Sequence, residues 1–344
     1  MKKIETNQLS PEAKKSMVTR IITALVMVAI TVPCLILGNW LYFGFIVLIT
    51  GLAGYELVHI TKIEGKLKIA IYIITISLLI LLVNYIFFKN NWSSVVKGEN
   101  IDAWRFVTNG FENIELSSML IILTAAIFFI FSFVTEKMTI QYVLYFITMI
   151  IVVSLGIQSF LYLRFAPYHA WQVADKAYFD SASFPYFESL TLVLYLALGV
   201  TMNDIGAYFV GMLFGKHKMN PRISPKKTWE GFVGGIVFSA IISITFALVL
   251  ALVKKPIHPH FTLQEFYWPV IISLIMPLIG DVGDFIFSAI KRNEGIKDFS
   301  NLLPGHGGIL DRIDSLLFAG GAVAAMIAFI DFVAPIIEKI PGAN

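Results

Sequence analysis

Long apolar segments recur along the whole chain and alternate with short polar stretches. A helix needs about 20 apolar residues to cross the hydrocarbon core of a bilayer. Segments close to that length lie near 21–38, 41–60, 67–88, 118–134, 141–163, 188–215, 231–253, 267–290 and 315–335. This pattern predicts an all-α polytopic membrane protein with about nine transmembrane helices.

The polar stretches divide the predicted bundle into regions. A tail, 1–20, precedes an N-terminal region, 21–187, with about five helices, and a candidate catalytic region follows over 188–344. The polar stretches 89–117 and 164–187 show neither a phosphate loop nor a metal cluster, so we expect them to cover the outer face. No internal repeat is evident, which gives an inverted-repeat transporter little support.

Composition agrees with a membrane protein that has no separate soluble domain. Hydrophobic residues make up 57% of the chain and charged residues 14%, whereas soluble domains carry about 25% charged residues. The tail is basic and is not followed by an A-x-A cleavage site, so it resembles a cytosolic segment more than a signal peptide. Cys34 is the single cysteine and cannot form an internal disulfide.

Lysine and arginine positions predict the orientation, because these residues concentrate on the cytosolic side. With the N-terminus inside, cytosolic segments hold 18 of the 26 and outer segments hold 8. We therefore predict a cytosolic N-terminus and an outer C-terminus. Two basic loops, 216–230 and 291–314, then face the cytosol, although they supply 9 of the 18 and are not independent evidence.

The most distinctive run is SAIKRNEGIKDFSNLLPGHGGILDRID, residues 288–314. A PGHGG turn within it is flanked by three acids and four bases, namely Asp298, Asp311, Asp314, Lys291, Arg292, Lys297 and Arg312. Carboxylates can hold a divalent metal, and basic side chains can hold phosphate. His306 has no second His or Cys nearby, which argues against zinc. The run is a candidate site for a phosphorylated molecule at a membrane surface.

Two predicted spans carry acids that complement this run. In the sixth span, Asp204 and Tyr208 share a face of roughly 60° with Gly211 and Gly215. These glycines could equally form a packing stripe between helices. In the eighth span, the face of roughly 80° carries Asp281, Asp284, Ser288 and Lys291. That face could form one wall of a metal–phosphate site, or Asp284 could simply pair with Lys291 or Arg292.

The loop between the sixth and seventh spans is a candidate anion site. Ser224, Lys226, Lys227 and Thr228 immediately precede a glycine-rich helix start, and hydroxyls, ammonium groups and a helix N-terminus together favour an anion. Isolated acids in other spans, such as Glu56 and Asp331, are expected to make only local hydrogen bonds or to reach toward an interface.

These motifs resemble one family. The run from Ser288 to Asp314, the stretches DIGAY (204–208) and FGKHK (214–218), the stretch SPKKTWEG (224–231), and Gly283-Asp284 are similar to the signature of phosphatidate cytidylyltransferases, also called CDP-diacylglycerol synthases. The similarity is dense from Asp204 to Asp314 and weak in the first half. Many members carry Glu beside the signature serine, where this chain has Phe287, while Asp281 is an additional carboxylate.

The resemblance implies a homodimer in the plasma membrane, with an active site that faces the cytosol. It implies CTP and phosphatidate as substrates, CDP-diacylglycerol and pyrophosphate as products, and no nucleic-acid partner. Mg²⁺ is the implied cofactor, a second cation such as K⁺ is left open, and the ligand candidates are Asp284, Asp311 and Asp281.

Roles at the reaction centre are implied for Asp284, Asp311, Asp314, Ser288 and Lys291. Substrate contacts are implied for Lys226, Lys227, Thr228, Ser224, Arg292, Lys297, His306, Gly307, Gly308, Arg312, Asp204 and Tyr208.

Two alternatives remain open. In a channel or transporter, Asp204, Asp281 and Asp284 would line an ion path, but the basic loops would have no purpose there. A CTP-dependent enzyme with another acceptor, such as an isoprenoid-ether phosphatidate or a polyprenol, would share the same site.

Overall fold

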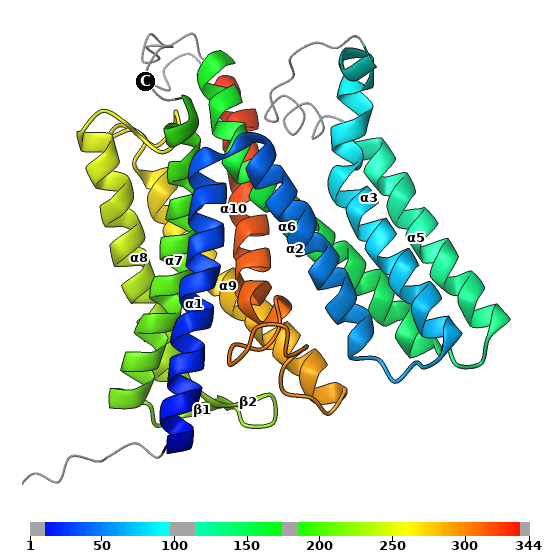
Figure 1. The fold of residues 1–344 in the computed structure, drawn as a ribbon. Coiled ribbons are helices and arrows are strands. Elements are labelled where there is room, and N and C mark those ends of the chain that lie inside the picture. The colour runs from blue at the N-terminus through cyan, green and yellow to red at the C-terminus, as the bar shows by residue number, and fades with distance from the viewer. Residues whose placement is uncertain (1–10, 97–113, 174–184, 338–344) are drawn as a thin grey trace, which may run out of the picture.

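The computed structural model describes residues 11–96, 114–173 and 185–337 (Figure 1). Its helices are α1 (Pro11–Leu37), α2 (Asn39–His59), α3 (Lys66–Val96), α5 (Ile114–Val134), α6 (Ile140–Val173), α7 (Pro185–Phe214), α8 (Trp229–Leu252), α9 (Tyr267–Asn293) and α10 (Leu310–Ile337). A short antiparallel hairpin, β1 (Lys218–Asn220) with β2 (Ser224–Thr228), connects α7 to α8.

Eight of the described helices are long and apolar enough to cross a membrane. A ninth apolar helical segment, Met119–Val134 in α5, is shorter. The prediction of an all-α polytopic membrane protein is confirmed. Each segment forms a helix because an apolar environment offers the backbone no other hydrogen-bond partners.

Several helices extend beyond the ends of the predicted apolar spans. Helix α1 begins at Pro11, inside the predicted tail, while α3 continues to Val96 and α6 to Val173, inside the predicted outer stretches. Residues 97–113 and 174–184 of those stretches lie outside the described residues, as do residues 1–10 and 338–344. Apolarity marks where a helix can lie in lipid, whereas its hydrogen bonds can continue into polar surroundings.

The two basic loops are also more ordered than their composition suggests. The stretch 216–230 contains the hairpin. Its two strands have only three and five residues, so the sequence pattern was too short to predict them. In the stretch 291–314, α9 extends to Asn293 and α10 begins at Leu310. Asp311 and Asp314 therefore project from the first turns of a helix rather than from a loop.

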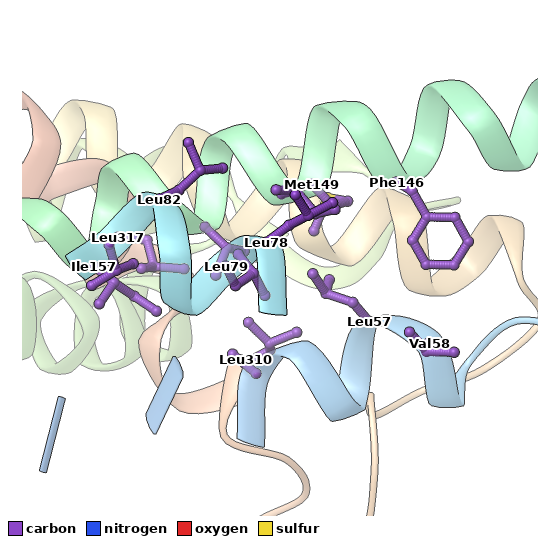
Figure 2. Packing of buried hydrophobic residues seen from close by; sticks show 14 of the residues in the cluster. Leu57, Val58, Leu78, Leu79, Leu82, Phe146, Met149, Ile157, Leu310 and Leu317 are labelled. Carbon is purple, nitrogen blue, oxygen red and sulfur yellow. The ribbon is translucent and has the colours of Figure 1, made fainter. Parts of the chain in front are cut away.

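The largest buried apolar cluster joins the two halves of the chain (Figure 2). It contains Leu57 and Val58 from α2, Leu78, Leu79 and Leu82 from α3, Phe146, Met149 and Ile157 from α6, and Leu310 and Leu317 from α10. The fully buried Leu310 belongs to the same cluster as Leu57. The start of α10 is thereby anchored to helices from the N-terminal half.

The hairpin, the α2–α3 turn and the segment 294–309 all lie at one end of the bundle, opposite the α8–α9 connection (Figure 1). Helices α7 and α8 approach closely at their hairpin ends. A side chain added to Gly206 would meet the Gly235 Cα at 3.2 Å, and one added to Gly231 would meet the Gly211 Cα at 3.1 Å. Of the two glycines for which a packing stripe was considered, Gly211 and Gly215, this contact supports that role for Gly211.

Candidate active site

The hairpin holds two adjacent lysines, Lys226 and Lys227, at one end of the bundle. Its turn is stabilised by the Asn220 side chain, whose Oδ1 accepts hydrogen bonds from the backbone of Arg222 and Ile223. At the other end, Thr228 caps α8 by accepting a 3.1 Å bond from the Gly231 amide. Lys226 and Lys227 are thus held directly before the first turn of α8.

Lys227 joins the hairpin to the acidic face of α9. Its Nζ lies 2.8 Å from Asp281 Oδ1 and 2.8 Å from Asp284 Oδ2. Burial by itself would lower the pKa of Lys227, but the charges of Asp284 and Asp281 outweigh it and raise the pKa above its ordinary value. The lysine therefore stays protonated, and Asp284 pairs with it rather than with Lys291 or Arg292.

Asp281 has a second partner on α7. The side-chain amide of Asn203 donates a 3.0 Å hydrogen bond to Asp281 Oδ2, so both carboxylate oxygens of this buried acid have partners. On the same face of α9, the Ser288 hydroxyl donates to Asp284 Oδ1 at 3.2 Å. The predicted acidic face thus forms one continuous network with α7 and the hairpin.

Asp311 is the centre of a second network, at the start of α10. Lys291 Nζ lies 2.7 Å from Asp311 Oδ1. The other oxygen, Oδ2, accepts hydrogen bonds from the backbone amides of Phe299 and Gly308 at 2.8 and 2.9 Å. Asp311 therefore fixes the fold of the glycine-rich segment and orients the lysine on α9.

Asp314 lies one turn further along α10. It is buried and accepts a 2.8 Å hydrogen bond from the Ser315 amide. Asp284 and Ser288 of the first network lie on the same helix as Lys291 of the second, so the two networks adjoin along α9.

A pocket of about 390 Å³ opens beside the first network. Six predicted residues line it: Asp204, Tyr208, Lys226, Lys227, Thr228 and Asp281. Ala207, Met212 and Phe232 supply apolar wall, and Lys218 adds a further positive charge. Tyr208 and Met212 are largely exposed on the outer surface of α7. The pocket thus combines charged and apolar side chains in one lining.

The remaining predicted residues are more dispersed. Arg292 donates to the backbone carbonyls of Ile223 and Ile296, and so ties the end of α9 to the hairpin. Lys297 and Arg312 are exposed, and His306 and Ser224 are partly buried.

Gly307 and Gly308 serve the protein's own carboxylates. Gly307 has a left-handed φ of 84° and packs against Asp311. The Gly308 amide is bonded to Asp311.

Phe287, the position at which the resemblance led us to expect an acid, faces the core. Its side chain is fully buried and makes edge-to-face contacts with Phe299 and Phe318, with ring centroids 5.7 and 6.3 Å away. The position therefore supports the glycine-rich segment by packing.

Glu56 is a residue of the site that was not predicted to belong to it. Glu56, on α2, was expected to form only a local hydrogen bond, but it is buried and bonds to Ser300, Ile309 and Leu310. The available signal was a carboxylate inside an apolar span, which is costly without a partner. Nothing in the sequence indicates which distant residues provide that partner.

The donor set suits a hard divalent cation. Among the residues that the structure describes, no three His, Cys, Asp or Glu side chains are arranged to hold a metal by themselves. Mg²⁺ usually takes only one or two carboxylates and completes its shell with water and substrate phosphates. The ammonium of Lys227 already lies between two of these carboxylates, which shows that they favour a cation.

Comparison with known proteins identifies the family of this chain. The phosphatidate cytidylyltransferase of Bacillus subtilis strain 168 is 45% identical over 129 residues, which are 38% of this chain and 44% of that protein. The proteins of the same name from Staphylococcus saprophyticus and Staphylococcus aureus strain COL are each 42% identical, over 131 and 132 residues. These matches cover 38% of this chain and 46% of each relative, so the chain spans less than half the length of the relatives it matches. Over a much longer range, residues 18–330 match the model of the cytidylyltransferase family, and the chain belongs to that family.

Proposed function

We propose that this protein transfers CMP from CTP to phosphatidate, giving CDP-diacylglycerol and pyrophosphate for phospholipid synthesis. Family membership and the printed name of the relatives support a CTP-dependent nucleotidyltransferase. The signature from Ser288 to Asp314 supports the same activity.

The observation that carries this proposal is the pocket between α7, α8 and the hairpin. It brings Lys226 and Lys227 together with Asp204 and Asp281, and its lining also includes apolar side chains such as Met212 and Phe232. A lipid phosphate needs such a combination, because the headgroup requires positive charge while the acyl chains remain in the bilayer. A path for a bare cation would need neither the apolar wall nor the paired lysines.

The proposed reaction is an in-line displacement. An oxygen of the phosphatidate phosphate attacks the α-phosphorus of CTP, the bond from that phosphorus to the bridging oxygen breaks, and pyrophosphate leaves. Such a transfer needs alignment and charge neutralisation more than covalent help from the protein. Lys226, Lys227 and Lys291 would bind the phosphates, and the second network would hold the site in shape.

Substrate contacts are further proposed for the residues around these lysines. Thr228 and Ser224 would bind phosphate through their hydroxyls, and Arg292, Lys297 and Arg312 through their charges. His306 and Tyr208 would contact the substrates from the rim, whereas Gly307 and Gly308 face the protein's own carboxylates and are not proposed to approach substrate.

Mg²⁺ fits the acids of α9 and α10. We propose that Asp284 and Asp311 hold it, with Asp281 and Asp314 nearby. When bound, Mg²⁺ would neutralise phosphate charge. A second cation such as K⁺, and assembly as a homodimer, belong to the same proposal and rest on the resemblance alone.

The orientation is proposed from charge. The hairpin, the segment 294–309 and the α2–α3 turn share one end of the bundle (Figure 1), and the stretches that contain them, 216–230, 291–314 and 61–68, carry 12 of the 18 lysines and arginines that were assigned to the cytosol. The positive-inside rule therefore supports a site at the cytosolic face. We propose the plasma membrane as its location.

The direct test is pyrophosphate release by the purified full-length protein. Release should require both CTP and phosphatidate and should yield CDP-diacylglycerol. Polyprenyl phosphate and an isoprenoid-ether phosphatidate, supplied in place of phosphatidate, test the alternative acceptors. No CTP-dependent product with any acceptor would reject the enzymatic function and leave the transporter interpretation.

A further inference from the structure

Glu56 connects the N-terminal half of the chain to the start of α10. Its Oε1 accepts hydrogen bonds from the Ser300 hydroxyl at 2.6 Å and from the Ile309 amide at 2.8 Å. Its Oε2 accepts from the Leu310 amide at 2.8 Å. The carboxylate is fully buried. A residue of α2 therefore caps a helix that begins 254 positions later in the chain.

The surrounding residues are shaped to admit this carboxylate. A side chain at Gly308 would lie 2.5 Å from Glu56 Oε1 and 2.7 Å from Oε2. Next to Glu56, Leu57 packs in the same buried cluster as Leu310 (Figure 2). The bare backbone at position 308 and the apolar contact between α2 and α10 together bring Glu56 to the helix end.

Glu56 and Asp311 divide the free amides of this helix start between them. Glu56 binds those of Ile309 and Leu310, while Asp311 binds that of Gly308. The first amides of a helix lack partners within the helix and attract anions. Here they are already satisfied by two carboxylates, so this helix end positions the protein's own acid instead of offering a site for substrate phosphate.

We propose that Glu56 is a positioning residue for Asp311, and through it for Lys291. Glu56 fixes the segment from Ser300 to Leu310, and that segment supplies the Gly308 amide that orients the Asp311 carboxylate. Lys291 is in turn held 2.7 Å from Asp311. The contact itself is independent of the activity, whereas its catalytic consequence rests on the proposed function.

The first arm of the test measures the contact without any substrate. Hydrogen exchange of the full-length protein in detergent is compared for the wild type and Glu56→Gln. The glutamine keeps one acceptor oxygen, but its NH₂ group replaces the other oxygen and cannot accept a hydrogen bond from the Ser300 hydroxyl or from the Ile309 and Leu310 amides. Peptides covering 299–312 should exchange about 10-fold faster or more, because amide bonds to a charged acceptor are lost. Peptides from α8 should be unchanged. Unchanged exchange over 299–312 would overturn the proposal.

The second arm measures catalysis by the folded fraction. Glu56→Gln should lower kcat by about 10- to 100-fold, as is typical for residues that orient a metal ligand. The KM for CTP should change little, because Glu56 does not line the pocket. Loss of folded protein with normal kcat per folded molecule would show a purely structural role and overturn the positioning claim.

Gly308→Ala supplies an independent variant. The added methyl group should displace the Glu56 carboxylate, so Gly308→Ala and Glu56→Gln should lower kcat by similar factors and the double variant by no more than either. Multiplying effects would mean that Gly308 acts separately from Glu56, which would count against the proposal. Gly321→Ala, within α10 and with nothing within 4 Å of the added methyl group, is the matched control and should retain normal kcat.

Failure of the proposed function gives a different result. In that case the wild type would make no CDP-diacylglycerol, yet faster exchange in Glu56→Gln would still establish that Glu56 holds the helix start.

Discussion

Lys227 on the hairpin forms a 2.8 Å ion pair with Asp284 on α9. The two residues belong to segments that are separated by the whole of α8 and its connection to α9. In the proposed reaction, the ammonium of Lys227 binds a phosphate and the carboxylate of Asp284 binds a cation. The same ammonium lies 2.8 Å from Asp281, so it neutralises part of the negative charge of the two acids and holds both of them at the site.

Replacing Lys227 by glutamine should slow the reaction strongly. A hydrogen bond to a charged group contributes about 1.5–3 kcal/mol, which corresponds to a fall of roughly 10- to 150-fold in kcat/KM for CTP. Lys227→Arg should recover only part, because a planar guanidinium cannot replace a compact ammonium between two carboxylates. Steady-state kinetics on the purified variants measure this.

Lys226→Gln tests the other lysine of the hairpin. Lys226 lines the same pocket but is exposed, so its loss should weaken CTP use with less effect on folding than the loss of Lys227. Lys255→Gln, at the opposite end of the bundle, is the control. If both Lys226→Gln and Lys227→Gln kept the wild-type dependence on CTP, the hairpin would not belong to the active site.

Removing the charge of Asp284 or Asp311 should abolish turnover while the protein remains folded. The asparagine oxygen of Asp311→Asn can still accept from Phe299 or Gly308, so the segment should keep its backbone. Chelation with EDTA should stop the wild-type reaction, and added Mg²⁺ should restore it. Glu64→Gln, in the exposed α2–α3 turn, is the control. Near-normal activity of either variant at saturating Mg²⁺ would disprove the assignment of these acids.

Phe287→Ala should destabilise the protein. Truncating a buried phenylalanine typically costs about 3–5 kcal/mol, and Phe287 contacts both Phe299 and Phe318. The midpoint of thermal unfolding in detergent should fall clearly below that of Ile286→Ala, since Ile286 is exposed on the same helix. Equal midpoints for the two variants would show that the packing around position 287 matters little.

Single cysteines test the proposed sidedness. In a Cys34→Ser background, a cysteine at the exposed Asn301 should react with an impermeant maleimide only after cells are opened. A cysteine at the exposed Gln264, in the α8–α9 connection, should react from outside intact cells. The reverse labelling pattern would place the active site away from cytosolic CTP.

The sequence by itself predicted most of the helices and the residues that form the charged networks. Hydropathy is a property of each segment alone, so the spans could be located before any packing was known. Helical spacing also placed Asp281, Asp284, Ser288 and Lys291 on one face. In the structure, all four side chains take part in the hydrogen bonds of the two charged networks. The similarity of the signature correctly indicated the family.

Only the tertiary structure decided which charges meet. Spacing along α9 left Asp284 free to pair with Lys291 or Arg292, but helix packing brings Lys227 to it and gives Lys291 to Asp311. Glu56 looked like an isolated acid because its partners lie in a distant segment of the chain. A buried carboxylate must find hydrogen-bond donors, yet which donors it finds depends on how α2 packs against α10, and no local pattern encodes that contact.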